Sequence, residues 1–362
     1  MTASSAPTIA IVGVGLIGGS IGLAARARLD ARIRGWDPTD GVLETALEHG
    51  AVTAACGSLA EALDGAEAAF VAAPVGALVA AVRDTLAAAA GDCVVSDVGS
   101  TKRSVVAAID DRRFIGGHPL AGAETAGVVN ARGELFDGAT WYLTPTARTE
   151  GVLYERLHRL LVDLGARPAA LDADTHDALL ASVSHLPHVL ANVLVARAAR
   201  VLSEEGERLP ATGPSFRDAT RVAGANTAVW RDIYLANADA LVEAIDDTVR
   251  RLHEVRDALA SRDGPAVEAW NDGAREERRR LLEADLAGGD VHELRVAVPN
   301  RPGVVAEVAL ALGRAGVNII DMALYPAPDW STGTIALWVP AGERAAEAQA
   351  LVEGLGLTVA RP

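Results

Sequence analysis

The feature that most constrains this chain is a glycine-rich segment, Gly13-Val14-Gly15-Leu16-Ile17-Gly18, which directly follows a β-branched run and opens a helical pattern. In such a segment the first glycine permits a tight turn, the second lets a pyrophosphate approach the backbone, and the third lets helix and strand pack closely. The phosphates then face the unpaired N–H groups of the helix N-terminus. This context predicts a dinucleotide-binding domain in which Gly13, Gly15, Leu16, Ile17 and Gly18 contact the cofactor.

The choice between NAD and NADP depends on Asp37, which ends the second predicted strand 19 residues after Gly18. A carboxylate there can bind the 2′-hydroxyl of the adenosine ribose and would repel a 2′-phosphate. The residue therefore favours NAD as the cofactor. Arg34 lies close by in the sequence and leaves NADP open as an alternative.

Three regions of the chain differ in their hydrophobic rhythm. Residues 8 to about 171 alternate short β-branched runs with helical patterns, which predicts a parallel sheet covered by helices on both faces. The expected strands are Ile9–Val12, Arg32–Trp36, Ala68–Ala72, Cys93–Ser96, Arg113–Ile115 and Thr140–Leu143, and the expected helices are Leu16–Arg28, Val75–Ala89 and Gly151–Leu164.

The second region, residues 172–287, has few strand signals and long helical patterns, broken at Leu209–Pro214 and Asp263–Pro265. Because an elongated helical region cannot bury its own faces, we expect it to pack on the first domain and on a second copy of the chain. Residues 291–362 follow a short linker with a β-α-β-β-α-β pattern that is typical of a ferredoxin-like module. The predicted domains are thus 1–171, 172–287 and 291–362.

The charge of the chain excludes several classes of partner. Its 48 acidic and 33 basic residues give a net charge of −15, which disfavours nucleic acids and anionic membrane surfaces. Two cysteines cannot build a disulfide framework, no Cys/His cluster has metal-binding spacing, and no uncharged apolar stretch reaches membrane-spanning length. We therefore expect a cytoplasmic protein without a metal. All the basic residues are arginines except Lys102, so this one lysine is worth locating.

Polar residues follow several of the predicted strands, at the edge of the sheet where open α/β folds bind ligands. Pro74, Asp97 and Ser100 are expected to complete the cofactor site. His118 lies in a Gly116–Glu124 segment that reads as a loop stiffened by Pro119. A neutral imidazole there could take the proton of a substrate hydroxyl while hydride leaves for nicotinamide, and Ser100 could hydrogen-bond the same hydroxyl or orient the histidine.

Two further clusters lie in the helical region. Ser184 and His188 stand four residues apart on one predicted helical face, with Pro187 expected to kink the helix. Arg217 and Arg221 are also four apart and could bind carboxylates through their guanidinium groups. Read alone, an Arg-Asp-x-x-Arg helix is usually a surface ion-pair face. The remaining histidines are interpreted as structural or surface residues: His49, His158, His176, His253 and His292.

Taken together, these motifs make the chain resemble the prephenate/arogenate dehydrogenase family of tyrosine biosynthesis over about residues 8–286. The matching segments are Gly13–Gly18, Asp97–Lys102, Gly117–Gly122 with Glu124, Ser184–His188 and Arg217–Arg221. The resemblance implies NAD-dependent oxidative decarboxylation of prephenate to 4-hydroxyphenylpyruvate and CO2 by a homodimer.

The resemblance also implies roles for individual residues. His118 is the catalytic histidine, assisted by Ser100, and Arg221 holds a substrate carboxylate. His188 and Ser184 contact the substrate side chain. The remaining pocket residues implied by the resemblance are Glu124, His185, Arg217 and Asp218.

Residues 291–362 resemble an ACT domain, a ligand-sensing module of amino-acid pathway enzymes, on the basis of Val298–Val305 and Gly316–Ile319. A loop that feeds a helix N-terminus could hold the carboxylate of an amino acid such as tyrosine. The expected effector-binding residues are Asn300, Arg301, Pro302, Gly303 and Asn318. A packing module without a ligand is the alternative.

Three alternatives to prephenate oxidation stay open at this point. Arogenate could be the substrate, because the sequence does not clearly distinguish its amino group from the keto group of prephenate. A β-hydroxyacid dehydrogenase is weaker, because it would not need both the Gly117–Gly122 and the Arg217–Arg221 segments. A non-catalytic sensor of NAD and an amino acid would be expected to lose Ser100, His118 and Arg221, all of which are present.

Overall fold

The structure is a computed structural model and forms two compact units, Met1–Val249 and Arg250–Pro362, each described here by itself. It describes residues 6–122, 125–204, 213–285, 291–299, 321–327 and 331–360, with the single positions 301, 304, 307, 308, 311, 312, 315 and 317. The predicted fold class is confirmed: a nucleotide-binding α/β domain, a helical region and a small α/β module follow one another along the chain.

The first unit contains an eight-stranded sheet with the order β3-β2-β1-β4-β5-β6-β7-β8. The pairs from β3 to β6 are parallel, β6 and β7 are antiparallel, and β7 and β8 are parallel again. The expectation of an all-parallel sheet was therefore wrong at β7. The strands are β1 (Thr8–Val12), β2 (Arg32–Trp36), β3 (Ala54–Ala55), β4 (Ala68–Val71), β5 (Val94–Asp97), β6 (Phe114–Pro119), β7 (Thr140–Thr144) and β8 (Arg167–Ala170).

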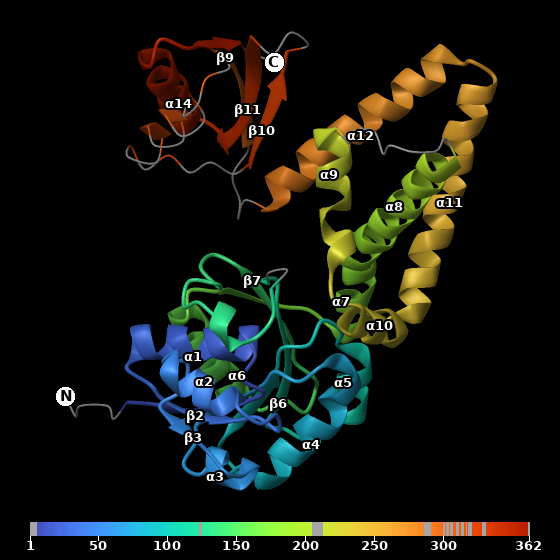
Figure 1. Cartoon of the computed structure of the whole chain (residues 1–362). Helices are drawn as coiled ribbons and strands as arrows, with labels where there is room; N and C mark the ends of the chain where they lie inside the picture. The colour runs from blue at the N-terminus through green and yellow to red at the C-terminus, as the bar shows by residue number, and fades with distance from the viewer. Residues whose placement is uncertain are drawn as a thin grey trace. The chain divides into compact units, whose positions relative to one another are not determined.

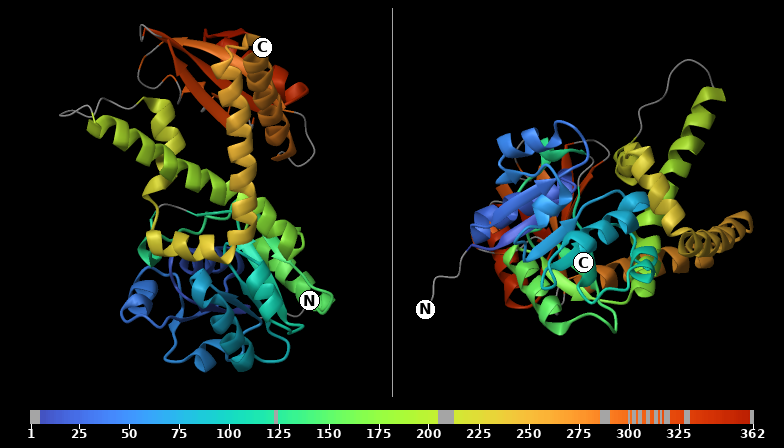
Figure 2. Two further views of the ribbon diagram at one scale, coloured as in Figure 1. Left: turned by 90° about the vertical axis from the view of Figure 1, so that its right-hand side faces the viewer. Right: turned by 90° about the horizontal axis from the view of Figure 1, so that it is seen from below.

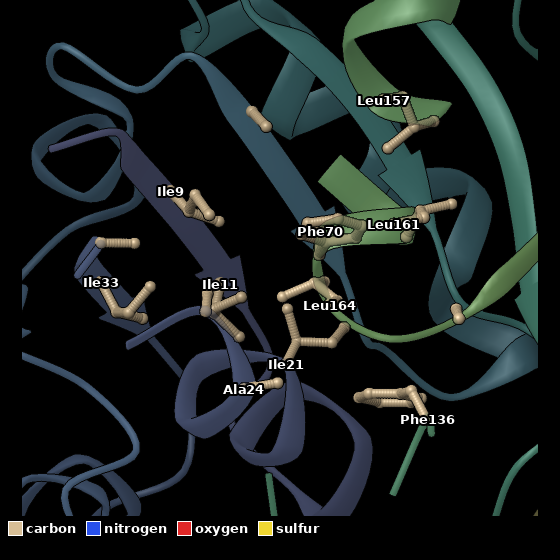
Figure 3. Packing of buried hydrophobic residues seen from close by; sticks show 14 of the residues in the cluster. Ile9, Ile11, Ile21, Ala24, Ile33, Phe70, Phe136, Leu157, Leu161 and Leu164 are labelled. Atoms are coloured by element: carbon tan, nitrogen blue, oxygen red, sulfur yellow. The ribbon is translucent and has the colours of Figure 1, made fainter. Parts of the chain in front are cut away.

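Helices cover both faces of this sheet (Figure 1). Ile9 and Ile11 of β1 point to the face packed by α1 and α6, whereas Ala10 and Val12 point to the face packed by α3, α4 and α5. Figure 3 shows the first of these cores, to which α1 contributes Ile21, β4 contributes Phe70 and α6 contributes Leu161. The helices of this domain are α1 (Leu16–Leu29), α2 (Val42–Glu48), α3 (Leu59–Leu63), α4 (Leu78–Ala88), α5 (Arg103–Ala108) and α6 (Gly151–Asp163), with 3-10 turns η1 (Val75–Ala77) and η2 (Val128–Asn130).

Strand β6 is longer than its sequence pattern indicates. The predicted strand ended at Ile115, but β6 continues through His118 and Pro119, where it pairs with β7 in the register His118↔Tyr142. The interpretation of Gly116–Pro119 as a loop was therefore wrong. The sequence pattern does not predict this part of the strand, because Gly116 and Gly117 lie in its middle and glycine has a low strand propensity.

The helical region continues from β8. It comprises α7 (Ala173–Leu180), a π-helical segment η3 (Ala181–His185), α8 (Leu186–Glu204), α9 (Pro214–Thr220), the 3-10 turn η4 (Arg221–Gly224), α10 (Thr227–Ala236), α11 (Ala238–Ala260) and α12 (Gly264–Asp285). Helix α8 extends away from the nucleotide-binding sheet (Figure 2). The π-helical segment lies directly before the Leu186-Pro187 pair, so the expected distortion of the helix is present and precedes the proline.

The second unit contains a four-stranded antiparallel sheet with the order β10-β11-β9-β12. Besides the end of α11 and all of α12, its elements are β9 (Val291–Pro299), β10 (Asp321–Pro326), β11 (Thr332–Pro340), α14 (Glu343–Gly354) and β12 (Thr358–Ala360). The inward side chains of β9, which include Leu294, Val296 and Val298, pack with β11 and α14 into a separate core. This arrangement confirms the predicted ferredoxin-like module.

Candidate active site

The glycine-rich turn has the geometry that the sequence predicts for phosphate binding. Gly13 adopts φ +92°, and its N–H donates a hydrogen bond to the Trp36 carbonyl at 2.9 Å. A Cβ on Gly18 would lie 2.1 Å from the Gly13 carbonyl oxygen, so this position requires the close helix–strand approach that only glycine allows. A Cβ on Gly15 would meet nothing within 4 Å, which leaves space for a phosphate above the helix N-terminus.

Leu16 and Ile17 begin α1, and their half-buried side chains pack against the core of the domain. Their contact with the cofactor stays a prediction. Pro74 is exposed and precedes η1, two residues beyond Ala72 at the carboxyl end of β4. All three residues thus lie around the same edge of the sheet as Gly13, because β1 and β4 are parallel neighbours.

Asp37 is fixed beside this turn. Its carboxylate accepts hydrogen bonds from the Val14 N–H at 2.8 Å and from the Thr39 N–H at 2.9 Å. Arg34 is engaged elsewhere, because its guanidinium donates two hydrogen bonds to the Glu61 carbonyl. A pocket of about 440 Å³ is lined by Gly15, Asp37, Gly41, Val128 and neighbouring residues. The cradle fits NAD, and no described contact turns Arg34 toward a 2′-phosphate.

Asp97 joins the two strands at the centre of the site. Its carboxylate accepts hydrogen bonds from Gly99 N–H at 2.8 Å and Gly117 N–H at 3.1 Å, and it forms an ion pair with Lys102 Nζ. Both charged side chains are completely buried. These contacts tie the end of β5 to β6, and a direct contact of Asp97 with the cofactor remains a prediction.

The two glycines before His118 allow β6 to pack closely against its neighbouring strands. A Cβ on Gly117 would lie 2.6 Å from the Asp97 carbonyl oxygen and from Ser96 Oγ, and a Cβ on Gly116 would lie 2.3 Å from Thr144 Oγ1. Two glycines at these positions therefore allow β6 to approach β5 and its buried ion pair closely. The same packing brings the His118 end of β6 next to the loop that carries Ser100, whose side chain is half-buried.

His118 is buried, with 8% of its surface exposed, at the carboxyl end of β6. Burial lowers its pKa well below 6.5, and the nearby His176, Lys102 and His185 lower it further. The imidazole is therefore neutral at physiological pH and can accept a proton. A neutral imidazole is the state expected of a base at this position.

Two residues that were not predicted as part of the site lie directly behind His118. His118 Nδ1 lies 2.9 Å from His176 Nε2, and His176 Nδ1 lies 2.8 Å from Asp177 Oδ1. Both His176 and Asp177 are fully buried at 0% exposure. The interpretation of His176 as one more structural histidine therefore missed its contact with the predicted catalytic residue.

The Ser184–His188 segment continues this cluster along the helix. His185 is 1% exposed, and burial lowers its pKa to about 4. It lies 3.2 Å from Asn237 Nδ2 and is also an electrostatic neighbour of His118, while Ser184 is half-buried. His185 belongs to the π-helical segment, so the simple four-residue helical spacing assumed for Ser184 and His188 does not hold across it.

His188 sits in an aromatic cage that the sequence did not reveal. Its ring stacks on Trp230 with a centroid distance of 3.6 Å and an interplanar angle of 5°. Its Nδ1 contacts the Tyr234 hydroxyl and lies 3.2 Å from Asn192 Nδ2. Trp230 and Tyr234 lie four residues apart on α10, a spacing that could have signalled one aromatic face.

The remaining predicted substrate residues do not meet His118 in the described contacts. Arg217 and Asp218 of α9 and Arg221 of η4 are exposed, although η4 packs against α8. Glu124 lies outside the described residues. Of the predicted effector residues, Arg301 is exposed and pairs with Glu307. The other four also lie outside the described residues: Asn300, Pro302, Gly303 and Asn318.

Within the part of the chain that the structure describes, no group of three or more His, Cys, Asp or Glu side chains is arranged to hold a metal ion. The site instead combines a glycine-rich nucleotide cradle with a buried neutral histidine at adjacent strand ends. This arrangement can bind a dinucleotide and accept a proton from a neighbouring substrate.

Comparison with known protein families assigns a domain to each region of the chain. Residues 21–169 match the nucleotide-binding domain of prephenate dehydrogenase, and residues 172–270 match the dimerization domain of the same enzyme. Residues 292–351 match the ACT domain.

Individual relatives agree with this assignment. The chain is 31% identical to a prephenate dehydrogenase of Bacillus subtilis over 325 residues, which cover 87% of each protein. It is 33% identical to a cyclohexadienyl dehydrogenase of Zymomonas mobilis over 264 residues, which cover 71% of this chain and 89% of that protein. Among solved structures it resembles prephenate dehydrogenase from Aquifex aeolicus in complex with hydroxyphenyl propionate and NAD+, with TM-score 0.72 and 27% identity. That match covers 77% of this chain and all of the other.

Proposed function

Because the chain belongs to the prephenate dehydrogenase family, we propose that it catalyses the NAD-dependent oxidative decarboxylation of prephenate to 4-hydroxyphenylpyruvate and CO2. The protein is an oxidoreductase with NAD as its cofactor, and the cradle formed by Gly13, Gly15 and Asp37 fits that cofactor. Bound NAD supplies the hydride acceptor for ring C4 of the substrate. Loss of CO2 makes the ring aromatic, which renders the reaction essentially irreversible.

The observation that carries the proposal is the buried, neutral His118 at the strand ends that flank the cofactor cradle. His118 Nε2 accepts the proton of the C4 hydroxyl as hydride leaves, and Ser100 assists by hydrogen-bonding the same hydroxyl. A pKa held below 6.5 by burial keeps the imidazole able to take this proton at neutral pH. Its burial also excludes water from the reacting atoms.

The substrate is a small dianion, whereas the protein carries a net charge of −15. The pocket must therefore be locally positive. We assign Arg221 to a substrate carboxylate, with Arg217 and Asp218 at the edge of the pocket. Ser184, His185 and His188 take the side-chain end of the substrate, and Glu124 completes the pocket.

Purified protein should form NADH when it is supplied with NAD and prephenate. His118→Asn should lower kcat by about 10²-fold or more, because it removes the proton acceptor. Arg221→Ala should mainly raise KM, because a charged hydrogen bond worth about 1.5–3 kcal/mol is lost in both the bound substrate and the transition state. A wild-type protein that forms no NADH from prephenate or arogenate contradicts the proposal, and an unchanged kcat in the histidine variant removes His118 from its role.

Arogenate is a second candidate substrate, supported by the similarity to a cyclohexadienyl dehydrogenase. Arogenate carries an amino group where prephenate carries a keto group, so the residues at the side-chain end of the pocket decide between them. His188, locked between Trp230 and Tyr234, is the residue best placed to do so. Comparing kcat/KM for the two substrates measures the preference directly.

We infer that the helical region forms a homodimer. Residues 173–200 form a helical run with a mean hydropathy of 1.6 over its most apolar window. By length and composition alone this run could cross a membrane, and only 28% of the window is buried. Val193, Leu194 and Val195 on α8 expose 57%, 44% and 38% of their surface. The matched dimerization domain indicates that a second copy covers this face, so Val193→Asp should shift the protein from dimer toward monomer in analytical ultracentrifugation.

We propose that the ACT domain binds an amino acid, with tyrosine as the feedback effector. Asn300–Gly303 follow Pro299 directly in the sequence. A pocket of about 660 Å³ is lined by Val298, Pro299, Tyr325 and Thr332. Millimolar tyrosine should change the activity and raise the melting temperature. If tyrosine and phenylalanine leave both unchanged, the module serves only for packing.

A further inference from the structure

The contacts behind His118 form one continuous chain of hydrogen bonds. Asp177 Oδ1 accepts from the Lys102 N–H at 2.7 Å and Oδ2 accepts from the Arg103 N–H at 2.9 Å. His176 Nδ1 lies 2.8 Å from Oδ1, and His176 Nε2 lies 2.9 Å from His118 Nδ1. Because the two backbone N–H groups can only donate, the Asp177 carboxyl must present acceptors to them.

This constraint sets which atoms of the chain can donate and which must accept. Hydrogen bonds from His176 and from the two backbone amides outweigh burial and lower the pKa of Asp177, so its carboxylate is ionised and can only accept. His176 Nδ1 must therefore carry the proton that it donates to Asp177. If the His176 ring carries only this one proton, its Nε2 is an acceptor, and His118 Nδ1 must donate to it.

We propose that His176 and Asp177 are positioning residues that hold His118 in the tautomer with Nδ1 protonated and the Nε2 lone pair free toward the substrate. The proposal rests on the role of His118 as the proton acceptor, given above. It adds that the catalytic state of His118 is set by a His–Asp pair on α7, a helix from the opposite side of the domain boundary.

The proton balance of the step is simple. The substrate hydroxyl gives its proton to Nε2, and His118 becomes an imidazolium that still donates Nδ1–H to His176. No proton needs to pass further, because the hydrogen bond to His176 Nε2 alone stabilises the new positive charge. In the opposite tautomer Nε2 would already carry a proton, and His118 could not act as a base.

Other charged and titratable groups around the pair leave this assignment intact. Lys102 is held by Asp97, so its charge is compensated within β5 and its loop. His185 faces the pair from the π-helical segment and is neutral, because burial lowers its pKa to about 4. Tyr142 of β7 packs edge-on against the His176 ring, with centroids 5.7 Å apart. In the described contacts of His176, Asp177 is the group that supplies a negative charge.

Two substitutions of His176 separate positioning from packing. Phenylalanine fills the space without an acceptor, so His176→Phe should lower kcat about 10²-fold while KM changes by about 2-fold at most. Glutamine carries a donor and an acceptor spaced much like the two imidazole nitrogens, so His176→Gln should recover most of kcat. His158→Gln on α6 is the matched control and should leave kinetics unchanged.

The tautomer itself can be read by nitrogen-15 NMR of the histidine-labelled full-length protein, with the His118 signals assigned by their loss in His118→Asn. The wild-type ring should show protonated Nδ1 and unprotonated Nε2. In His176→Phe the acceptor for the His118 Nδ1–H is absent, so the His118 signals should shift toward a mixture that includes protonated Nε2, together with the loss of kcat.

An Nε2-protonated His118 in the wild type overturns the proposal, as does a wild-type kcat in His176→Phe. The NMR result does not depend on which substrate the enzyme uses. Absence of NADH formation by the wild type would instead overturn the proposed function and leave the tautomer measurement to decide the positioning role.

Discussion

Replacing the single lysine by methionine tests how the centre of the site is held together. Lys102→Met keeps the apolar part of the side chain but removes the ammonium group that pairs with Asp97. Both side chains are 0% exposed, so the Asp97 carboxylate would remain charged in the interior with only the N–H groups of Gly99 and Gly117 as partners. Breaking a buried ion pair in this way costs about 3–5 kcal/mol.

The two remaining backbone hydrogen bonds place the expected loss near the lower end, at about 3 kcal/mol. Removing both charges should cost less, so Asp97→Asn combined with Lys102→Met should recover much of the stability lost in the single variant. Lys102→Arg keeps the charge but adds a bulky planar group. A Cβ on Gly116 would already lie 3.3 Å from Lys102 Cδ, so the arginine should overpack the site by about 1–3 kcal/mol.

The assay is urea unfolding followed by circular dichroism, together with hydrogen exchange of peptides that span β5 and β6. Exchange locates the loss in the first unit, which a global transition of a two-unit chain cannot do. A loss below about 1 kcal/mol in Lys102→Met would refute the reasoning. So would a double variant that is less stable than Lys102→Met. If Lys102→Arg is as stable as the wild type, close packing is not the reason why this position holds a lysine while all other Lys/Arg positions of the chain hold arginine.

Three further predictions concern the cradle and the buried histidines. Asp37→Ser should raise KM for NAD about tenfold and weaken the preference over NADP, because a hydrogen bond from a charged acceptor is lost, as steady-state kinetics with both cofactors will show. Gly18→Ala should lower the melting temperature and weaken NAD binding in calorimetry, since its Cβ would lie 2.1 Å from the Gly13 oxygen, whereas Gly273→Ala, with nothing within 4 Å, should do neither. Because the pKa of His185 is lowered to about 4 in the folded state, unfolding should become easier by about 3 kcal/mol as pH falls from 6.5 to 4, and His185→Gln should flatten this dependence in urea titrations.

The parts of the fold that the sequence predicted correctly are those whose signal is local. The β-branched run of β1 and the turn after it can be read directly, because a strand, three glycines and a helix follow one another in the sequence. Strand β8 was missed because Pro168 interrupts it and most of its side chains are exposed, as suits an edge strand. Strand β3 has only two residues and no pattern of its own.

Some residues of the site could be predicted from the sequence and others could not, again because only local signals can be read. His118 and Ser100 belong to segments rich in glycine and polar residues at expected strand ends, so their neighbourhood alone marked them. Trp230, in contrast, is far from His188 in the sequence, and its stacking depends on α10 folding back beside α8. Arg221 was marked by its spacing, yet its η4 segment is exposed in the single chain, which agrees with a pocket that a second copy helps to close.

The His176–Asp177 pair shows most clearly what the pattern of a single segment leaves out. Asp172 caps α7 by accepting a hydrogen bond from the Thr175 N–H at 2.9 Å, so His176 falls in the first turns of a short, ordinary-looking helix. Its partner His118 is 58 residues earlier, on a strand that the glycines disguised. A histidine judged alone is usually structural. Asp177, however, accepts hydrogen bonds from the backbone N–H groups of Lys102 and Arg103 at the start of α5, and the same carboxylate requires a proton on His176 Nδ1. The functional assignment therefore follows from counting donors and acceptors in the buried cluster, which requires the tertiary structure.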